Sequence, residues 1–187
     1  MTEPCRIRPA TAQDIDAIQQ IYAWHVLHGI ATFEEIVPDC EQMRARFNDI
    51  TTQGYPYIVA EQQGEILGYA YVSAYRPRVA YRYTVENAIY LRHDLARRGT
   101  GSLLLAELIR LCEAGPWRQM IAVIGNSGNL ASIGVHRKAG FDMIGTLPAT
   151  GFKHGQWVDT VLMQRALSSG SLTPPDSVEP TIRASAH

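Results

Sequence analysis

The sequence lacks the features that mark secreted, membrane-spanning and metal-binding proteins. Its only cysteines are Cys5, Cys40 and Cys112, an odd number without a Cys-x-x-Cys spacing, which favours reduced thiols in a cytoplasmic protein over disulfides or a structural zinc. No stretch of about 18 apolar residues occurs, so no membrane span is expected. The first residues also lack the apolar core of a signal peptide. The histidines form neither an HExxH motif nor a two-histidine, one-carboxylate spacing, so no metal site is expected.

The chain also lacks an excess of basic residues. Its 17 Lys and Arg residues are balanced by 18 Asp and Glu residues, which gives a net charge of -1. A general nucleic-acid-binding protein needs a positive field to neutralise phosphates, so no nucleic-acid partner is expected, just as no membrane partner is. Of 187 residues, 46% are hydrophobic and 19% are charged. This composition is typical of a globular chain with one sizeable core.

Apolar periodicity predicts one mixed α/β domain over residues 1–167. Its expected order is a strand, two helices, a meander of three strands, a helix, a strand, a helix and two final strands. The strands are expected near residues 5–10, 55–62, 66–75, 81–92, 118–125, 141–150 and 157–167. The helices are expected after Thr11 or Asp14, after Asp39, after Gly101 and after Asn129. Residues 168–187 are rich in Ser and Pro, and we expect a flexible tail there.

Two glycines, Gly99 and Gly101, directly precede a leucine-rich helical pattern in "RRGTGSLLLAELIRLCEAG". A helix start offers unpaired backbone N–H groups and a partial positive charge, and glycine removes the Cβ that would keep an anion away. Arg97 and Arg98 add positive charge, so the segment suits a pyrophosphate. It is not a P-loop, because no Gly-Lys-Ser/Thr follows, and it is not a Rossmann fingerprint, because Leu104 occupies the third glycine position. The alternative is a tight turn that needs glycine for its own conformation.

The segment "LARRGTGSLLLAELI" resembles the acetyl-CoA pyrophosphate loop of the GNAT N-acetyltransferases, whose pattern is Gln/Arg-x-x-Gly-x-Gly/Ala. Ala96 departs from the first position of that pattern. A second segment, "GNLASIGVHRKAGFDMIG", is similar to the family's Asn-containing helix that ends in Gly-Phe. The resemblance implies acetyl-CoA as the co-substrate. It also implies the GNAT fold, an α/β (α+β) fold with a mixed, mostly antiparallel sheet of about seven strands flanked by about four helices.

Further segments resemble the phosphinothricin and methionine sulfoximine acetyltransferase subgroup: "IATFEEIVP", "YTVENAIYL", "AVIGNSGNLASIGVHRKAGF" and "GFKHGQWVDTVLMQ". This resemblance implies a cytoplasmic homodimer, connected with herbicide resistance, that acetylates the α-amino group of small glutamate- or methionine-like amino acids. Because Cys112 falls inside a helix, no cysteine is placed as a nucleophile, and direct attack in a ternary complex is expected. Two alternatives stay open: an acceptor that is a protein N-terminus or an antibiotic amine, and a non-catalytic acetyl-CoA sensor.

Two residues are candidates for the catalytic proton transfers. Glu86 lies in "YTVENAIY", a strand pattern suited to burial, where a carboxylate is costly unless it has partners or a function. Burial would raise its pKa toward a value useful for a general base. His136 is assigned to the active site through the resemblance, alone or in a relay with Glu86. The structural alternatives are a salt-bridged glutamate and a histidine that only packs in a helix.

The resemblance also implies the coenzyme contacts. The backbone amides of Ile89, Tyr90 and Leu91 are expected beside the pantetheine arm and the thioester oxygen. Residues of the glycine turn are expected to hold the pyrophosphate: Arg97, Arg98, Gly99, Thr100, Gly101 and Ser102. Asn129 matches the family's coenzyme-contacting asparagine but would also suit a helix cap. Ser132 either reaches the coenzyme or faces solvent.

An amino-acid acceptor brings at least one carboxylate. Arg76 and Arg78, in the loop segment "YRPRVAY", are candidates to bind it bidentately; the alternative is that they are ordinary surface arginines. We expect further residues to line the acceptor pocket, although aromatic residues there could equally belong to the core: Phe33, Glu34, Tyr81 and Tyr83. Lys153 and its neighbour His154 are expected to close the site.

Overall fold

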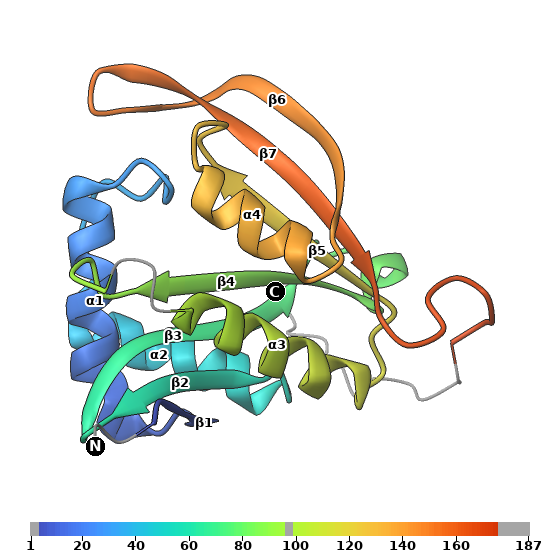
Figure 1. The fold of residues 1–187 in the computed structure, drawn as a ribbon, viewed down its shortest axis with the longest axis horizontal. Helices are drawn as coiled ribbons and strands as arrows, with labels where there is room; N and C mark the ends of the chain where they lie inside the picture. The colour runs from blue at the N-terminus through green and yellow to red at the C-terminus, as the bar shows by residue number, and fades with distance from the viewer. Residues whose placement is uncertain (1–3, 96–98, 176–187) are drawn as a thin grey trace, which may run out of the picture.

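The computed structural model describes residues 4–95 and 99–175, and one seven-stranded sheet forms its centre (Figure 1). The strands lie in the order β1-β2-β3-β4-β5-β7-β6. Neighbouring strands are antiparallel except β4 and β5, which run parallel. From β1 to β7 the bounds are Arg6–Pro9, Tyr57–Gln62, Glu65–Ala74, Thr84–Leu91, Gln119–Gly125, Asp142–Lys153 and Gln156–Ala166. The fold class predicted from the sequence is confirmed.

Two helices cover each face of this sheet. α1 (Ile15–His28) and α2 (Cys40–Thr52) lie on one face, and α3 (Thr100–Glu113) and α4 (Leu130–Lys138) lie on the other (Figure 1). Because strand side chains alternate between faces, β2 and β3 contribute to two separate buried clusters. The cluster under α1 and α2 includes Tyr57, Val59 and Tyr69. The cluster under α3 includes Ile58, Ala60, Ala70 and Val72.

The first two helices begin where the sequence predicts. At the start of α2, the backbone N–H of Gln42 donates to Asp39 Oδ1 at 2.8 Å, and the Gln42 side chain accepts from the Asp39 N–H at 3.0 Å. This reciprocal capping satisfies two N–H groups that a helix start leaves unpaired. A short 3-10 turn over Ala12–Asp14 leads into α1. Gly29 follows the last residue of α1.

The structure differs from the expected elements at three places. α3 begins at Thr100, so Gly101 lies in its first turn rather than before the helix. The strand expected over residues 81–92 begins only at Thr84, because Val79–Tyr81 forms a 3-10 turn. The expected tail begins at residue 168, yet its first residues are anchored to the domain. Ser168 donates to the carbonyl of Glu113 at 3.0 Å, and Arg118 donates to the carbonyl of Pro174 at 3.1 Å. The rest of the expected tail, residues 176–187, lies outside the described residues.

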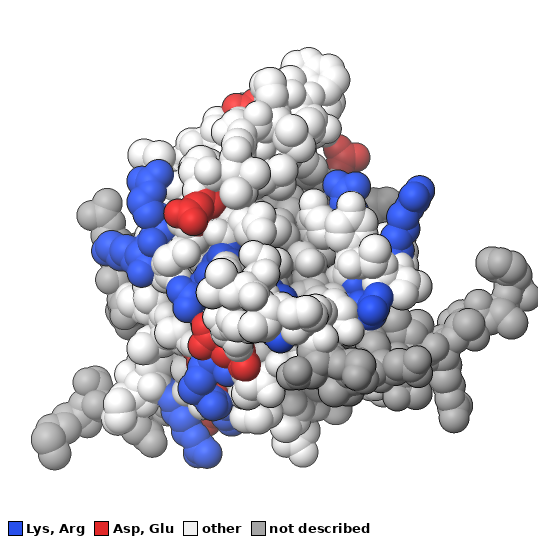
Figure 2. All heavy atoms as spheres, turned by 90° about the vertical axis from the view of Figure 1, so that its right-hand side faces the viewer, with Lys and Arg blue, Asp and Glu red and all other residues white. Residues whose placement is uncertain are grey.

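The surface in Figure 2 carries Lys and Arg side chains in separate groups, with Asp and Glu among them, rather than as one continuous basic area. None of the helices in residues 4–95 and 99–175 is long and apolar enough to span a bilayer. In the same part of the chain, no group of three or more His, Cys, Asp and Glu side chains is arranged to hold a metal ion.

Candidate active site

Glu86 lies in the middle of the sheet, on β4. Its cross-strand neighbours are Ser73 of β3 and Ile121 of β5. Residues directly opposite each other share a face, so the side chain of Glu86 points to the same side as Ser73, the side of α1 and α2. Glu86 forms no ion pair with any described residue. Burial raises the pKa of this half-buried carboxyl, and the positive charge of Arg76 partly offsets the rise.

His136 lies on α4 and is almost fully buried, with 4% of its surface exposed. Its Nδ1 is 2.8 Å from the carbonyl oxygen of Ser132, and its Nε2 is 3.0 Å from Oδ1 of Asn87. Burial lowers the pKa of the imidazole, which favours the neutral ring. In the neutral ring Nδ1 must donate to Ser132, so Nε2 must accept. This requires the Asn87 amide to be turned so that its nitrogen, which has no other partner among the described residues, donates to Nε2. Both ring nitrogens are therefore engaged.

The two catalytic candidates do not face each other. Asn87 directly follows Glu86 on β4, so their side chains point to opposite faces of the sheet. His136 contacts Asn87 and therefore lies on the side of α3 and α4. A direct Glu86–His136 relay, which was among the sequence predictions, does not fit this arrangement.

β4 and β5 pair only as far as Asn87 with Ala122. Beyond that point β4 continues along β3 to Leu91, while β5 continues along β7 to Gly125, and the two strands separate (Figure 1). Residues 88–91 therefore have a partner strand on one side only. The carbonyl of Leu91 lies 2.7 Å from His25 Nε2. The edge that carries Ile89 and Tyr90 is where the pantetheine arm was expected.

The start of α3 leaves its backbone N–H groups accessible. Gly99 is the N-cap residue, with a φ of 78° that side chains rarely adopt, and it provides no side-chain cap. A Cβ on Gly101 would meet only Leu91 Cδ1, at 3.4 Å. The hydroxyl-bearing residues beside them are Thr100, which is buried, and Ser102, which is exposed. The predicted contacts Arg97 and Arg98 lie outside the described residues.

Asn129 caps α4. Its Oδ1 accepts a hydrogen bond from the backbone N–H of Ser132 at 3.2 Å. The hydroxyl of Ser132 is 3.5 Å from Nδ1 of His136. The capping role considered for Asn129 is confirmed, and its predicted coenzyme contact stays a prediction.

The basic segment between β3 and β4 is exposed. Arg76 lies over the ring of Tyr75, with 5.1 Å between the guanidinium carbon and the ring centroid, and its charge acts on Glu86. Arg78 is the residue before the 3-10 turn. Within that turn, Tyr81 packs edge-on against Tyr75, with ring centroids 5.6 Å apart. The guanidinium carbon of Arg82 lies over the ring of Tyr83, 4.6 Å from the ring centroid.

The loop between α1 and α2 contacts the hairpin of β6 and β7. Lys153 is 1% exposed, and its ammonium donates to the carbonyl of Thr32 at 2.8 Å. Burial lowers the pKa of Lys153, opposed by Glu35 and Glu34. Phe33 lies so close to Gly151 that a Cβ there would come within 2.7 Å of the Phe33 ring. This loop is therefore held by the strand pair that the sequence expected to close the site. His154 is exposed in the turn between these strands.

Glu34 is bound within the protein. Arg46 donates to both of its carboxylate oxygens, at 2.7 and 3.1 Å, and the hydroxyl of Tyr22 donates to Oε1 at 2.9 Å. Burial would raise the pKa of Glu34, but the Arg46 and Tyr22 hydrogen bonds lower it overall. Because Tyr22 donates to Glu34, its oxygen accepts from the hydroxyl of Thr32, at 3.0 Å.

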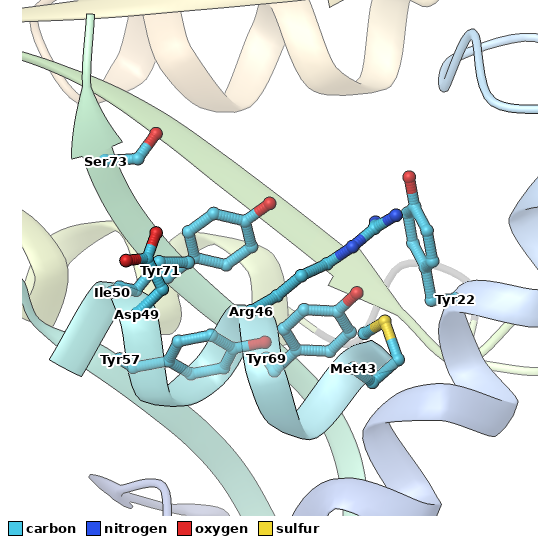
Figure 3. A pocket seen from close by; sticks show the side chains of 9 residues that line it. All are labelled: Tyr22, Met43, Arg46, Asp49, Ile50, Tyr57, Tyr69, Tyr71 and Ser73. Carbon is cyan, nitrogen blue, oxygen red and sulfur yellow. The ribbon is translucent and has the colours of Figure 1, made fainter. Parts of the chain in front are cut away.

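A cavity of about 260 Å³ lies between α2 and the sheet, on the side of Glu86 (Figure 3). We refer to it as the tyrosine pocket. It is lined by Tyr22, Met43, Arg46, Asp49, Ile50, Tyr57, Tyr69, Tyr71 and Ser73. Sequence reasoning named none of these residues as site residues. The lining residues come from α1, α2, β2 and β3, which are distant in sequence. The sequence pattern that could have pointed to the pocket is the pair of tyrosines at alternate positions of β3, Tyr69 and Tyr71.

Comparisons with known proteins show the family of this chain. The family model described as an acetyltransferase (GNAT) domain matches residues 7–162. A phosphinothricin N-acetyltransferase of Alcaligenes faecalis is 51% identical over 172 residues, which cover 92% of this chain and 87% of the relative. A methionine sulfoximine and methionine sulfone acetyltransferase of Pseudomonas aeruginosa is 39% identical over 169 residues, which cover 90% of this chain and 98% of the relative.

A solved structure shows the same fold. The crystal structure of a GNAT-superfamily phosphinothricin acetyltransferase from Sinorhizobium meliloti, in complex with acetyl-CoA, superposes with a TM-score of 0.90 and 47% sequence identity. The match covers 95% of each chain.

Proposed function

Because this chain belongs to the GNAT acetyltransferases, within the phosphinothricin and methionine sulfoximine acetyltransferase subgroup, we propose that it acetylates the α-amino group of a small amino acid. The acetyl donor is acetyl-CoA, and the acceptors are glutamate- or methionine-like, such as phosphinothricin, methionine sulfoximine and methionine sulfone. The observation that carries the proposal is the half-buried carboxyl of Glu86, which forms no ion pair with a described residue and lies beside the point where β4 and β5 separate.

The reaction needs a free amine, because an ammonium group has no lone pair. Glu86 accepts the proton of the ammonium as general base. The nitrogen then attacks the thioester carbonyl carbon, the C–S bond breaks, and the thiolate of the coenzyme takes up the second proton, which the nitrogen must lose to become an amide. The raised pKa of Glu86 brings the carboxylate closer to the basicity that this proton transfer needs. Because Cys112 is fully buried in α3, transfer through a cysteine is not part of the proposal.

The coenzyme is proposed to lie in the gap between β4 and β5. Its pantetheine arm follows the edge of residues 89–91, with the thioester oxygen at the Ile89 amide. Its diphosphate lies against the N–H groups at the start of α3, where the helix dipole favours an anion. The turn residues proposed to hold it are Arg97, Arg98, Gly99, Thr100, Gly101 and Ser102. Asn129 and Ser132, at the start of α4, are proposed to flank the coenzyme.

His136 is proposed as a positioning residue for Asn87 rather than as the base. Its two ring nitrogens are engaged with Ser132 and Asn87, so neither is available to accept a proton from the substrate. This assignment leaves Glu86 as the single base in the proposed mechanism.

The acceptor is proposed to lie on the side of α1 and α2. Arg76 is the preferred partner for its α-carboxylate, because its charge already acts on Glu86. Arg78, Tyr81 and Tyr83 form the adjoining exposed wall. On the opposite side, the loop of Phe33 and Glu34, held by Lys153, completes the site.

We further propose a cytoplasmic homodimer. The hairpin of β6 and β7 exposes a row of large apolar side chains, which supports burial against a second copy: Met143, Ile144, Leu147, Phe152 and Trp157. Light scattering of the purified protein tests this proposal by measuring the molar mass in solution. We expect the mass of a dimer.

A thiol-release assay with acetyl-CoA and a panel of amines tests the function. Release with amino-acid acceptors, but not with N-terminal peptides or aminoglycosides, is the expected result. Tight acetyl-CoA binding without release for any amine would instead indicate a sensor.

A further inference from the structure

We propose that His25, on α1, is a positioning residue for the edge of β4 along which the pantetheine arm of the coenzyme lies. Its imidazole donates a hydrogen bond to the carbonyl of Leu91, the last residue of β4, and so holds the part of this strand that has separated from β5. The inference rests on the proposed function, because it assumes a coenzyme in the gap between β4 and β5. It adds a residue of α1, far in sequence from every residue placed beside the coenzyme so far.

The backbone groups of β4 point alternately to its two sides, as they do in any strand of an antiparallel pair. At one end, the carbonyl of Thr84 accepts from the N–H of Tyr75, which follows β3, at 3.4 Å. At the other end, the N–H of Arg92 donates to the carbonyl of Leu67 in β3 at 2.9 Å. The even-numbered residues from 84 to 92 therefore point their backbone groups toward β3.

The backbone groups of Ile89 and Leu91 consequently point away from β3, into the gap that opens after the last pair of β4 with β5. The amide of Tyr90, which was also expected beside the pantetheine arm, points toward β3 instead. Of the groups that face the gap, the carbonyl of Leu91 is the one that His25 binds, at 2.7 Å. The N–H groups of Ile89 and Leu91 and the carbonyl of Ile89 are left for the coenzyme.

The chemistry of His25 suits a fixed donor. Burial lowers the pKa of this imidazole, the bond to Leu91 opposes that effect, and the charges of His93 and Lys153 lower the pKa further. The ring is therefore neutral near neutral pH and carries one N–H group. Because a carbonyl oxygen can only accept, this hydrogen is on Nε2. The carbonyl is thus satisfied without a charge at the end of the gap.

α1 holds the end of β4 at neighbouring positions as well (Figure 1). The ring of Trp24 stacks on that of His93, two residues beyond the end of β4, with centroids 4.6 Å apart and an angle of 7° between the planes. The ring of His25 itself lies 5.5 Å from that of Tyr90. The helix therefore contacts the last part of β4 through both aromatic packing and a hydrogen bond, and the hydrogen bond is the contact that fixes a backbone group facing the gap.

The side chain of Leu91 connects this contact to the start of α3. A Cβ on Gly101 would lie 3.4 Å from Cδ1 of Leu91, so Leu91 borders both the open edge and the proposed diphosphate site. If its carbonyl lost the bond to His25, the end of β4 could shift relative to α3. The pantetheine arm and the diphosphate would then no longer meet their partners at the correct spacing. The loss should appear in coenzyme binding rather than in binding of the amino acid.

Calorimetric titration of the folded variant His25→Leu tests the inference. This change removes the donor, and we expect the Kd for acetyl-CoA to rise about tenfold, as for one lost hydrogen bond. The Kd for 3′-phospho-ADP, the part of the coenzyme that lacks the pantetheine arm, should change little, because this fragment does not reach the edge of β4. In steady-state kinetics the KM for acetyl-CoA should rise with its Kd, while the KM for the amino acid stays near the wild-type value.

The variants His25→Gln and His25→Asn separate the hydrogen bond from the volume of the ring. The amide of Gln reaches the position of Nε2, whereas the amide of Asn is one methylene shorter and cannot reach the carbonyl of Leu91. We expect His25→Gln to keep an acetyl-CoA Kd near the wild-type value and His25→Asn to lose about tenfold. This pair also carries the test if His25→Leu does not fold, which urea unfolding shows.

His28→Leu is the matched control, because it makes the same replacement on the same helix at an exposed side chain. It should leave the acetyl-CoA Kd unchanged. Three results would each overturn the inference: an unchanged acetyl-CoA Kd in folded His25→Leu or His25→Asn, an equal loss for 3′-phospho-ADP, or a His25→Gln variant that binds as weakly as His25→Asn. These results would leave the proposed acetyl transfer standing. A wild-type protein that binds no acetyl-CoA would remove the proposed function and this inference together.

Discussion

Glu86 and Asn87 are consecutive residues of β4 whose side chains lie on opposite faces of the sheet. Glu86 shares its face with Ser73 and the tyrosine pocket. Asn87 is bound to His136 beneath α4. The sheet thus separates the half-buried carboxyl of Glu86, suited to proton transfer, from a buried polar pair suited to holding the strand in place. Substitutions on the two faces are therefore expected to affect different properties.

Glu86→Gln removes the proposed base and keeps the shape of its side chain. We expect kcat to fall by roughly 10²–10⁴, because the neutral amide cannot accept the proton of the ammonium. Acetyl-CoA affinity, measured by calorimetry, is expected to stay near that of the wild-type protein, since the coenzyme site lies elsewhere. A kcat within twofold of the wild-type value would contradict the assignment.

The pH dependence of kcat should reflect the raised pKa of Glu86. A base must be ionised to act, so kcat falls as the pH drops through that pKa. Burial raises the pKa, so this acidic limb is expected above the usual Glu value of about 4.3. Arg76 lowers the same pKa, so Arg76→Gln should shift the limb to higher pH, which saturating-substrate assays between acidic and neutral pH can measure. A limb that persists in Glu86→Gln would assign it to another group.

His136→Leu tests the positioning role. It leaves the amide of Asn87 and the carbonyl of Ser132 without their partner, so the free energy of unfolding should fall by about 1–3 kcal/mol. We expect kcat to fall less than tenfold, because the proposed chemistry does not use the imidazole. Urea unfolding and thiol-release kinetics on the same variant provide both numbers.

The double variant His136→Leu/Asn87→Leu is the control for this effect. Removing both polar partners should recover part of the lost stability, because no buried amide is then left unpaired. A large loss of kcat in His136→Leu, with unchanged unfolding, would instead support direct catalysis by the histidine.

The sequence predicted those features of the structure that depend on residues close together in the chain. The glycine pair at the start of α3, the Asp39 cap of α2 and the strand around Glu86 each depend on neighbouring residues, and each is found. The tyrosine pocket was not predictable in this way, because its walls come from two helices and two strands that meet only in the fold. The side on which His136 lies also depends on how α4 packs against the sheet.

Lys153→Met tests whether the buried lysine holds the acceptor loop. The replacement has similar length but loses the hydrogen bond to the carbonyl of Thr32. We expect a loss of about 1–2 kcal/mol in unfolding free energy, and a KM for the amino acid raised severalfold with kcat nearly unchanged. Steady-state kinetics at saturating acetyl-CoA measures both parameters. A KM equal to that of the wild-type protein would show that the loop is held by its other contacts.

Gly101→Val tests the diphosphate site at the start of α3. A Cβ at this position would lie 3.4 Å from Leu91 Cδ1, an ordinary contact, so the fold should tolerate the side chain. The branched side chain would nevertheless cover N–H groups that an anion must approach. Since charge interactions at a helix start contribute about 1 kcal/mol or more, we expect acetyl-CoA affinity to fall about tenfold in calorimetry. The KM for the amino acid should change far less.

Gly134→Val on α4, where a Cβ meets no atom within 4 Å, is the matched control and should keep coenzyme affinity. Equal losses of coenzyme and amine binding in Gly101→Val would indicate a distorted fold rather than a blocked diphosphate site.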